Sequence, residues 1–141
     1  MKLDSVEACV NRAVDAFDNG SHCAQSALLG FAPCLGLDTE EARKMAASFG
    51  GGIGGLHETC GALCGALIAD GMIEGDFAPG DTEGKEAHYA RVQRIAERFR
   101  ADNGSIFCRD IRREDPEERH HYCSACVKSA VLSVLKEIGS L

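Results

Sequence analysis

The chain has 141 residues, of which 45% are hydrophobic and 26% charged, and its formal net charge is -7. This length fits one domain with a single core, which we expect to span residues 1–141. The composition excludes a wholly disordered acidic chain, and the negative charge disfavours a nucleic-acid partner because it repels phosphate groups.

The N-terminal segment and the longest apolar run predict neither export nor membrane insertion. Asp4 and Glu7 interrupt the stretch that a secretory signal needs to be apolar. The run Cys60–Ala69 is about half as long as a membrane-spanning helix. We therefore expect a cytoplasmic protein without a membrane span.

Apolar residues at three- and four-residue intervals predict helices along the whole chain, and strand-like alternation is almost absent. The predicted helices lie between Val6 and Phe17, from Ser21 to Pro33, from Asp38 to Phe49, from Cys60 to about Asp70, between Gly84 and Asn103, and from Asp115 to Ile138. Their expected N-terminal caps include Asp4 with Glu7, Ser21, Asp38, Thr59 and Asp115. Ser105 is the expected cap of a short turn that holds Cys108. The sequence thus predicts an all-α fold, a single-domain bundle of five or six helices.

A glycine-rich tract at residues 50–55 separates two of these helices. Gly50, Gly52 and Gly55 have the spacing of a dinucleotide-binding fingerprint, but that motif follows a strand, and a helical pattern precedes the tract here. We interpret the tract as a loop whose backbone approaches a buried site.

Cysteine is the unusual component of the composition, with eight residues in the chain. In a reducing cytoplasm, this number favours metal ligation or thiol redox chemistry over structural disulfides. Covalent haem is excluded because Val127 follows the Cys123-Ser124-Ala125-Cys126 segment where histidine would be needed.

Five segments carry a resemblance to a known family: Cys23-Ala24-Gln25-Ser26, Phe49-Gly50-Gly51-Gly52-Ile53-Gly54, Thr59-Cys60-Gly61-Ala62, Cys108, and Cys123 with Val127 and Ala130. In order and spacing, the chain resembles the C_GCAxxG_C_C family of redox-active proteins, which has four characteristic cysteines and a CGAxxG motif. By position, these four fall on Cys23, Cys60, Cys108 and Cys123. Cys9, Cys34, Cys64 and Cys126 lie outside the pattern.

The resemblance implies a redox role, and a similar domain in split-Soret cytochromes is associated with an iron-sulfur cluster. Our first hypothesis is therefore that the four family cysteines bind a 2Fe-2S cluster for electron transfer or redox sensing. The loop Gly50, Gly51 and Gly52 would lie beside the cluster and donate backbone hydrogen bonds to its sulfurs.

A second hypothesis is a thiol-disulfide oxidoreductase or sensor that uses Cys60 and Cys123 as its catalytic residues. Cys60 begins a helix, where the helix dipole favours a thiolate, and Cys64 lies on the same helix face. A third hypothesis is a structural zinc site, which would combine the close pairs 60/64 and 123/126 and leave Cys23 and Cys108 unused.

Other polar residues are interpreted as exposed. This holds for His22, His57, His120 and His121, and for the arginine series 91, 94, 98 and 100, which we expect on a solvated helix face. The redox partner is unknown from the sequence, and a homo-oligomer is left open.

Overall fold

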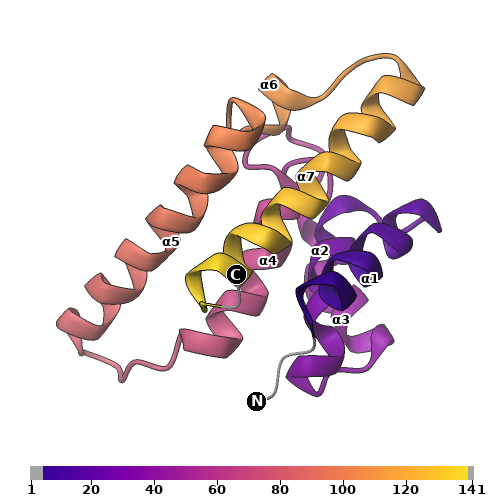
Figure 1. Cartoon of the computed structure of the whole chain (residues 1–141). Helices are drawn as coiled ribbons and strands as arrows, with labels where there is room; N and C mark the ends of the chain where they lie inside the picture. The colour runs from indigo at the N-terminus through magenta and orange to yellow at the C-terminus, as the bar shows by residue number, and fades with distance from the viewer. Residues whose placement is uncertain (1–4, 140–141) are drawn as a thin grey trace.

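The protein is described by a computed structural model that covers residues 5–139. The described residues form seven α-helices: α1 Val6–Asp18, α2 Cys23–Leu35, α3 Thr39–Ala46, α4 Gly61–Glu74, α5 Thr82–Asn103, α6 Cys108–Ile111 and α7 Pro116–Glu137. A 3-10 turn, η1, spans Ala47–Phe49. The all-α prediction is confirmed (Figure 1). The count of seven exceeds the predicted five or six because the turn at Cys108 closes into the four-residue helix α6.

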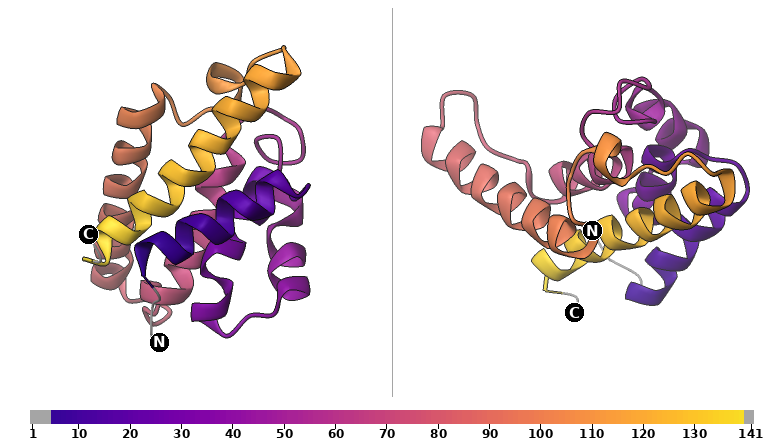
Figure 2. Two further views of the ribbon diagram at one scale, coloured as in Figure 1. Left: turned by 45° about the vertical axis from the view of Figure 1, so that its right-hand side comes forward. Right: turned by 90° about the horizontal axis from the view of Figure 1, so that it is seen from above.

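Three helices, α2, α4 and α7, form the centre of the bundle and contact one another. Helix α7 runs obliquely across the molecule, with α1 on one side and α5 on the other (Figures 1 and 2). Apart from Asp70, the large side chains enclosed by the helices are apolar: Leu28, Phe31, Leu63, Ile95, Phe99, Val127, Val131, Val134 and Leu135. The apolar stripe predicted for the last helix is therefore its core-facing side.

Several predicted helix boundaries are corrected by one or a few residues. His22, and not Ser21, is the N-cap of α2, because its Nδ1 accepts a hydrogen bond from the Gln25 backbone. Helix α4 begins after Cys60 without a side-chain cap, so the expected cap at Thr59 is wrong. The N-cap of α1 is Ser5, while the predicted cap Asp4 lies outside the described residues.

The crossing of α2 and α4 depends on glycine. A Cβ atom on Gly61 would lie 2.6 Å from the Cys23 sulfur, and one on Gly65 would collide with the Ala24 carbonyl oxygen. The two backbones therefore approach more closely than helices with larger residues at these positions would allow. The small residues of α4 predicted that another helix backbone would approach this helix closely, and α2 does so.

Three arginines of α5 join it to neighbouring helices, which corrects their interpretation as a solvated face, whereas Arg100 is exposed as predicted and contacts Glu97 of the same helix. Arg91 contacts the fully buried carboxylate of Asp70 in α4, with an Nη2–Oδ1 distance of 2.7 Å. Arg94 and Arg98 both contact Glu137 at the end of α7. Apolar burial along α5 is confined to Ile95 and Phe99, so these ionic contacts supplement a small apolar interface.

Within residues 5–139, none of the helices combines the length and apolar character that crossing a membrane requires.

Candidate redox site

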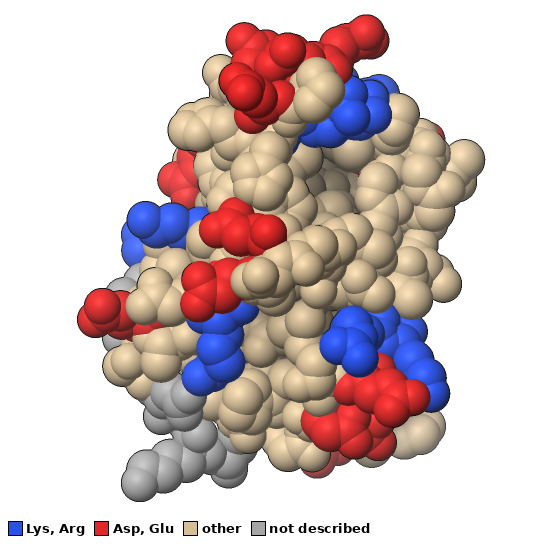
Figure 3. Space-filling model, turned by 90° about the vertical axis from the view of Figure 1, so that its right-hand side faces the viewer, with Lys and Arg blue, Asp and Glu red and all other residues tan. Residues whose placement is uncertain are grey.

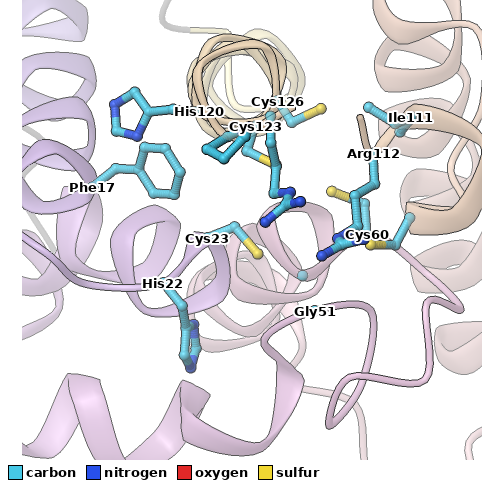
Figure 4. Close-up of a pocket in the computed structure, with 14 residues that line it drawn as sticks. Phe17, His22, Cys23, Gly51, Cys60, Ile111, Arg112, His120, Cys123 and Cys126 are labelled. Carbon is cyan, nitrogen blue, oxygen red and sulfur yellow. The ribbon is translucent and has the colours of Figure 1, made fainter. Parts of the chain in front are cut away.

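A cavity of about 300 Å³ opens where the end of α1 meets the beginnings of α2, α4, α6 and α7. Five of its lining residues are cysteines: Cys23, Cys60, Cys108, Cys123 and Cys126. Cys123 and Cys126 lie on the α7 side of the cavity, and Cys23 and Cys60 lie on the side formed by the starts of α2 and α4 (Figure 4). On the same side of the molecule, the surface has a hollow bordered mostly by uncharged residues, with basic groups at its margin (Figure 3).

Three of these cysteines are placed by helix N-termini. Cys23 is the first residue of α2, Cys60 is the N-cap of α4, and Cys108 is the first residue of α6. The free backbone N–H groups and the positive dipole ends of α2 and α4 thus face the cavity, where they favour negative charge on sulfur.

Helix α7 supplies the other two cysteines from one face, because Cys123 and Cys126 are three residues apart. Cys123 is half-buried, whereas Cys126 is only 1% exposed. The Cys126 thiol faces the Cys60 sulfur as a hydrogen-bond partner and also lies 3.5 Å from Asn103 Oδ1. Its single proton can therefore be donated to either group.

An antiparallel bridge between Thr59 and Phe107 holds the segments that lead into α4 and α6 together. The Cys60 N–H donates to the Ile106 carbonyl at 2.7 Å, and the Cys108 N–H donates to the Glu58 carbonyl at 2.6 Å. These bonds fix Cys60 and Cys108 relative to each other, although 47 residues lie between them in the chain.

The glycine loop lies beside the cysteines. Gly51 lines the cavity with a φ of +62°, and its N–H is a hydrogen-bond donor to the Cys23 sulfur. A Cβ on Gly52 would lie 2.7 Å from the Cys108 Cβ, and one on Gly50 would lie 2.7 Å from the His22 ring. The loop thus packs directly against two of the four family cysteines.

Most of the thiols are shifted towards the protonated form. Burial, followed by the charge of Cys60, raises the pKa of Cys23 to about 12, although the Gly51 and Ala24 N–H groups oppose the shift. Burial and Cys60 likewise raise the pKa values of Cys108 and Cys123, while the cationic Arg112 opposes both shifts.

Cys60 behaves in the opposite way. Its hydrogen bond with Cys126 lowers the Cys60 pKa despite burial, and the same bond raises the pKa of Cys126. The backbone N–H groups of Ala62 and Leu63 add further donors to the Cys60 sulfur. Cys60 is therefore the cavity thiol whose anionic form receives the most direct support.

The rim of the cavity is cationic and aromatic. Arg119 is fixed by hydrogen bonds to the carbonyls of Arg113 at 2.8 Å and Glu114 at 2.6 Å. The His120 ring stacks on Phe17 with centroids 4.7 Å apart, and its Nε2 lies 3.0 Å from an Asp18 oxygen. His120 is exposed, as predicted, and has these partners as well, whereas His22 is only partly exposed and caps α2.

A family model described as "Putative redox-active protein (C_GCAxxG_C_C)" matches residues 21–138. The chain belongs to this family. An uncharacterized protein of Archaeoglobus fulgidus is 28% identical over 151 aligned positions, which cover 96% of this chain and 98% of that protein. No solved structure matches the chain.

For this member of the C_GCAxxG_C_C family, the cavity contains all four cysteines assigned by the resemblance and adds Cys126. The sequence signal for Cys126 was its position three residues after Cys123. Cys64 does not line the cavity, and its thiol lies 4.0 Å from the Thr59 carbonyl oxygen. Cys9 and Cys34 lie elsewhere, between α1 and α2.

The arrangement required by the zinc hypothesis is not the one that the cavity contains, because Cys23 and Cys108 line it and Cys64 does not. Within the described part of the chain, no three His, Cys, Asp or Glu side chains are grouped so that they could hold a single metal ion. The cavity thiols are spread over its wall.

Proposed function

We propose that this protein transfers or senses electrons at the cysteine-lined cavity, with Cys23, Cys60, Cys108 and Cys123 as ligands of a 2Fe-2S cluster. The observation that supports this proposal is the convergence of four thiols from α2, α4, α6 and α7 on one cavity. Family membership supports the redox role but does not name the cofactor.

The donor set fits such a cluster in number and in chemistry. Iron-sulfur clusters of this type take four cysteine thiolates, two at each iron, so the ligands need not converge on one point. When bound, the cluster would supply a site that accepts and releases one electron.

The surrounding residues have definable roles toward such a ligand set. The Gly51 N–H donates to the Cys23 sulfur, and the N–H groups of Ala62 and Leu63 donate to the Cys60 sulfur. Such bonds stabilise anionic sulfur and raise a reduction potential. Arg112 adds a positive charge near Cys108 and Cys123.

A dithiol function is the second candidate, and the contact between Cys60 and Cys126 favours it. In this reaction, the Cys60 thiolate attacks a disulfide substrate and one substrate thiol leaves with a proton. The Cys126 thiol then loses its proton and attacks Cys60, which releases the second substrate thiol. The product is a Cys60–Cys126 disulfide, so the partner of Cys60 would be Cys126 and neither Cys64 nor Cys123.

Anaerobic purification followed by a visible spectrum and by iron, acid-labile sulfide and zinc analysis tests the proposal. We expect a coloured protein with stoichiometric iron and sulfide, and loss of both in Cys23→Ser, Cys60→Ser, Cys108→Ser and Cys123→Ser. Cys64→Ser and Cys34→Ser are the matched controls, because neither residue lines the cavity. Both controls should retain the cluster.

The other outcomes separate the alternatives. A colourless, metal-free protein with titratable thiols would contradict the cluster and support the dithiol, whose activity Cys126→Ser should abolish. Stoichiometric zinc that is lost from Cys64→Ser would contradict both candidates and support a structural zinc site.

A further inference from the structure

A second pair of cysteines lies away from the cavity, where α1 packs on α2. The Arg12 Nη2 atom lies 3.7 Å from the Cys9 sulfur and 3.8 Å from the Cys34 sulfur. The same atom donates to the Gly30 carbonyl at 2.9 Å. One guanidinium group therefore contacts both thiols and is held in place by the backbone of α2.

The helix packing brings the two cysteine positions close together. A Cβ on Gly30 would lie 2.8 Å from the Cys9 carbonyl oxygen, so α1 and α2 touch at this point. Cys34 lies one helical turn beyond Gly30 on the same face of α2. Both sulfurs contact the same Arg12 nitrogen, so displacement of the guanidinium group would let the two thiols approach each other.

The two thiols differ in accessibility. Cys9 is fully buried, whereas Cys34 is partly exposed. A dissolved reagent therefore reaches Cys34 first. The guanidinium group of Arg12 contacts both sulfurs and lies between the exposed and the buried thiol.

We propose that Cys9 and Cys34 are a second redox pair, which low-molecular-weight disulfides oxidise to a disulfide between α1 and α2. The Cys34 thiolate attacks one sulfur of the small disulfide, and the other sulfur leaves as a thiol with the proton that Cys34 lost. Cys9 then loses its proton and attacks the Cys34 sulfur, which releases the second small thiol. Two protein thiols are oxidised and one small disulfide is reduced to two thiols.

This pair is independent of the proposed function because its residues do not line the cavity. The bond would tie the hairpin of α1 and α2 at the end opposite the cavity, whereas Phe17 and Cys23 lie at the cavity end. It would close a covalent loop between positions 9 and 34, and such a loop restricts the unfolded chain. The oxidised protein should therefore melt at a higher temperature than the reduced one.

The experiment treats the purified full-length protein with oxidised glutathione and blocks the remaining thiols. The protein is then digested with trypsin and chymotrypsin, and the peptides are mapped by mass spectrometry. Cleavage after Phe31 separates Cys34 from Cys23, so the linkage can be assigned. We expect a peptide that joins Cys9 to Cys34 and a melting temperature that falls when the bond is reduced.

Three variants sharpen this test. Cys9→Ser should trap a glutathione adduct on Cys34, and Cys34→Ser should abolish both the adduct and the linkage. Arg12→Gln should form the linkage more slowly, because the side chain that contacts both sulfurs is lost. Cys64→Ser, a partly buried thiol outside both sites, should behave like the unmodified protein.

Two results would overturn the proposal, and both are read from the unmodified protein. One is a Cys34 adduct that persists while Cys9 remains alkylatable after unfolding. The other is the absence of any reaction at Cys34 under conditions in which oxidised glutathione modifies an unhindered cysteine peptide. Neither readout depends on whether the cavity holds a cluster.

Discussion

Arg112 is a cationic residue of the cavity, and within the described residues no carboxylate pairs with it. Its charge instead opposes the upward pKa shifts of Cys108 and Cys123. Figure 4 shows its side chain among the cysteines of the cavity wall. A fixed positive charge in this place favours any state of the site that carries additional negative charge.

We expect Arg112→Gln to lower the midpoint potential of the site by roughly several tens of millivolts, because reduction adds negative charge that Arg112 stabilises. The measurement is a redox titration followed by visible absorption. Arg109→Gln is the control, since Arg109 pairs with Glu58 at 2.8 Å and does not line the cavity. Equal potentials for the two variants would contradict this role.

The residues of the site were only partly predictable from the sequence. The four family cysteines and the glycine loop followed from the resemblance. The four cysteines and Gly51 line the cavity, and Gly50 and Gly52 flank it. Cys126 was interpreted as a small hydrophobic residue, and its burial agrees with that interpretation. Its contact with Cys60 depends on where α7 crosses the start of α4, and local sequence does not encode that crossing.

The crossing of α2 and α4 links the fold to the site. Gly61 lies where a Cβ would be 2.6 Å from the Cys23 sulfur and 2.6 Å from the Phe49 carbonyl oxygen. The same contact therefore sets the separation of two helices and the position of a candidate ligand. The CGAxxG motif thus has a packing role at this crossing.

We expect Gly61→Ala to destabilise the protein by about 1–3 kcal/mol, because the added methyl group overpacks the crossing. Gly71→Ala is the matched control in the same helix, where a Cβ would meet nothing within 4 Å. This control should be neutral or more stable by up to about 1 kcal/mol. Urea unfolding of both variants checks the difference, and equal midpoints would contradict the packing role.

The helix boundaries show which helix starts local sequence motifs can predict. Asp38 and Asp115 were predicted as caps and act as caps, because an aspartate side chain satisfies the N–H groups of the next turn without help from distant residues. Helix α4 instead begins after Cys60, whose N–H donates to the distant Ile106 carbonyl. A boundary set by tertiary contacts is not visible in a local motif.

Across the whole molecule, α5 is attached to the bundle by a few apolar residues and by ion pairs with α4 and α7. The half of α5 that follows Thr82 lies apart from the other helices (Figure 2). Glu137, which is 8% exposed, receives Arg94 and Arg98 together. Charged side chains therefore hold the two longest helices together near the end of α7.

This ion-pair arrangement predicts a pH dependence of stability. The hydrogen bond from Arg94 chiefly, with Arg98, lowers the pKa of Glu137. Its stabilising contribution is therefore complete above the unfolded pKa of about 4.3 and is lost as the pH falls through the lower folded pKa.

We expect Glu137→Gln to cost roughly 1 kcal/mol at pH 7 and to remove this part of the acid sensitivity. Urea unfolding at pH 7, 5, 4 and 3 measures both effects. Glu117→Gln, in the exposed first turn of α7, is the control and should follow the unmodified protein. An unchanged pH profile in Glu137→Gln would refute the prediction.

The four family cysteines come from the second, fourth, sixth and seventh helices, so the cavity is complete only when α7 is in place. During synthesis, Cys23 and Cys60 leave the ribosome long before Cys123. No nascent fragment that lacks α7 therefore presents the full set of thiols. Any cofactor that needs all four must be inserted after Cys123 has been translated, and a product that is truncated before α7 cannot retain it.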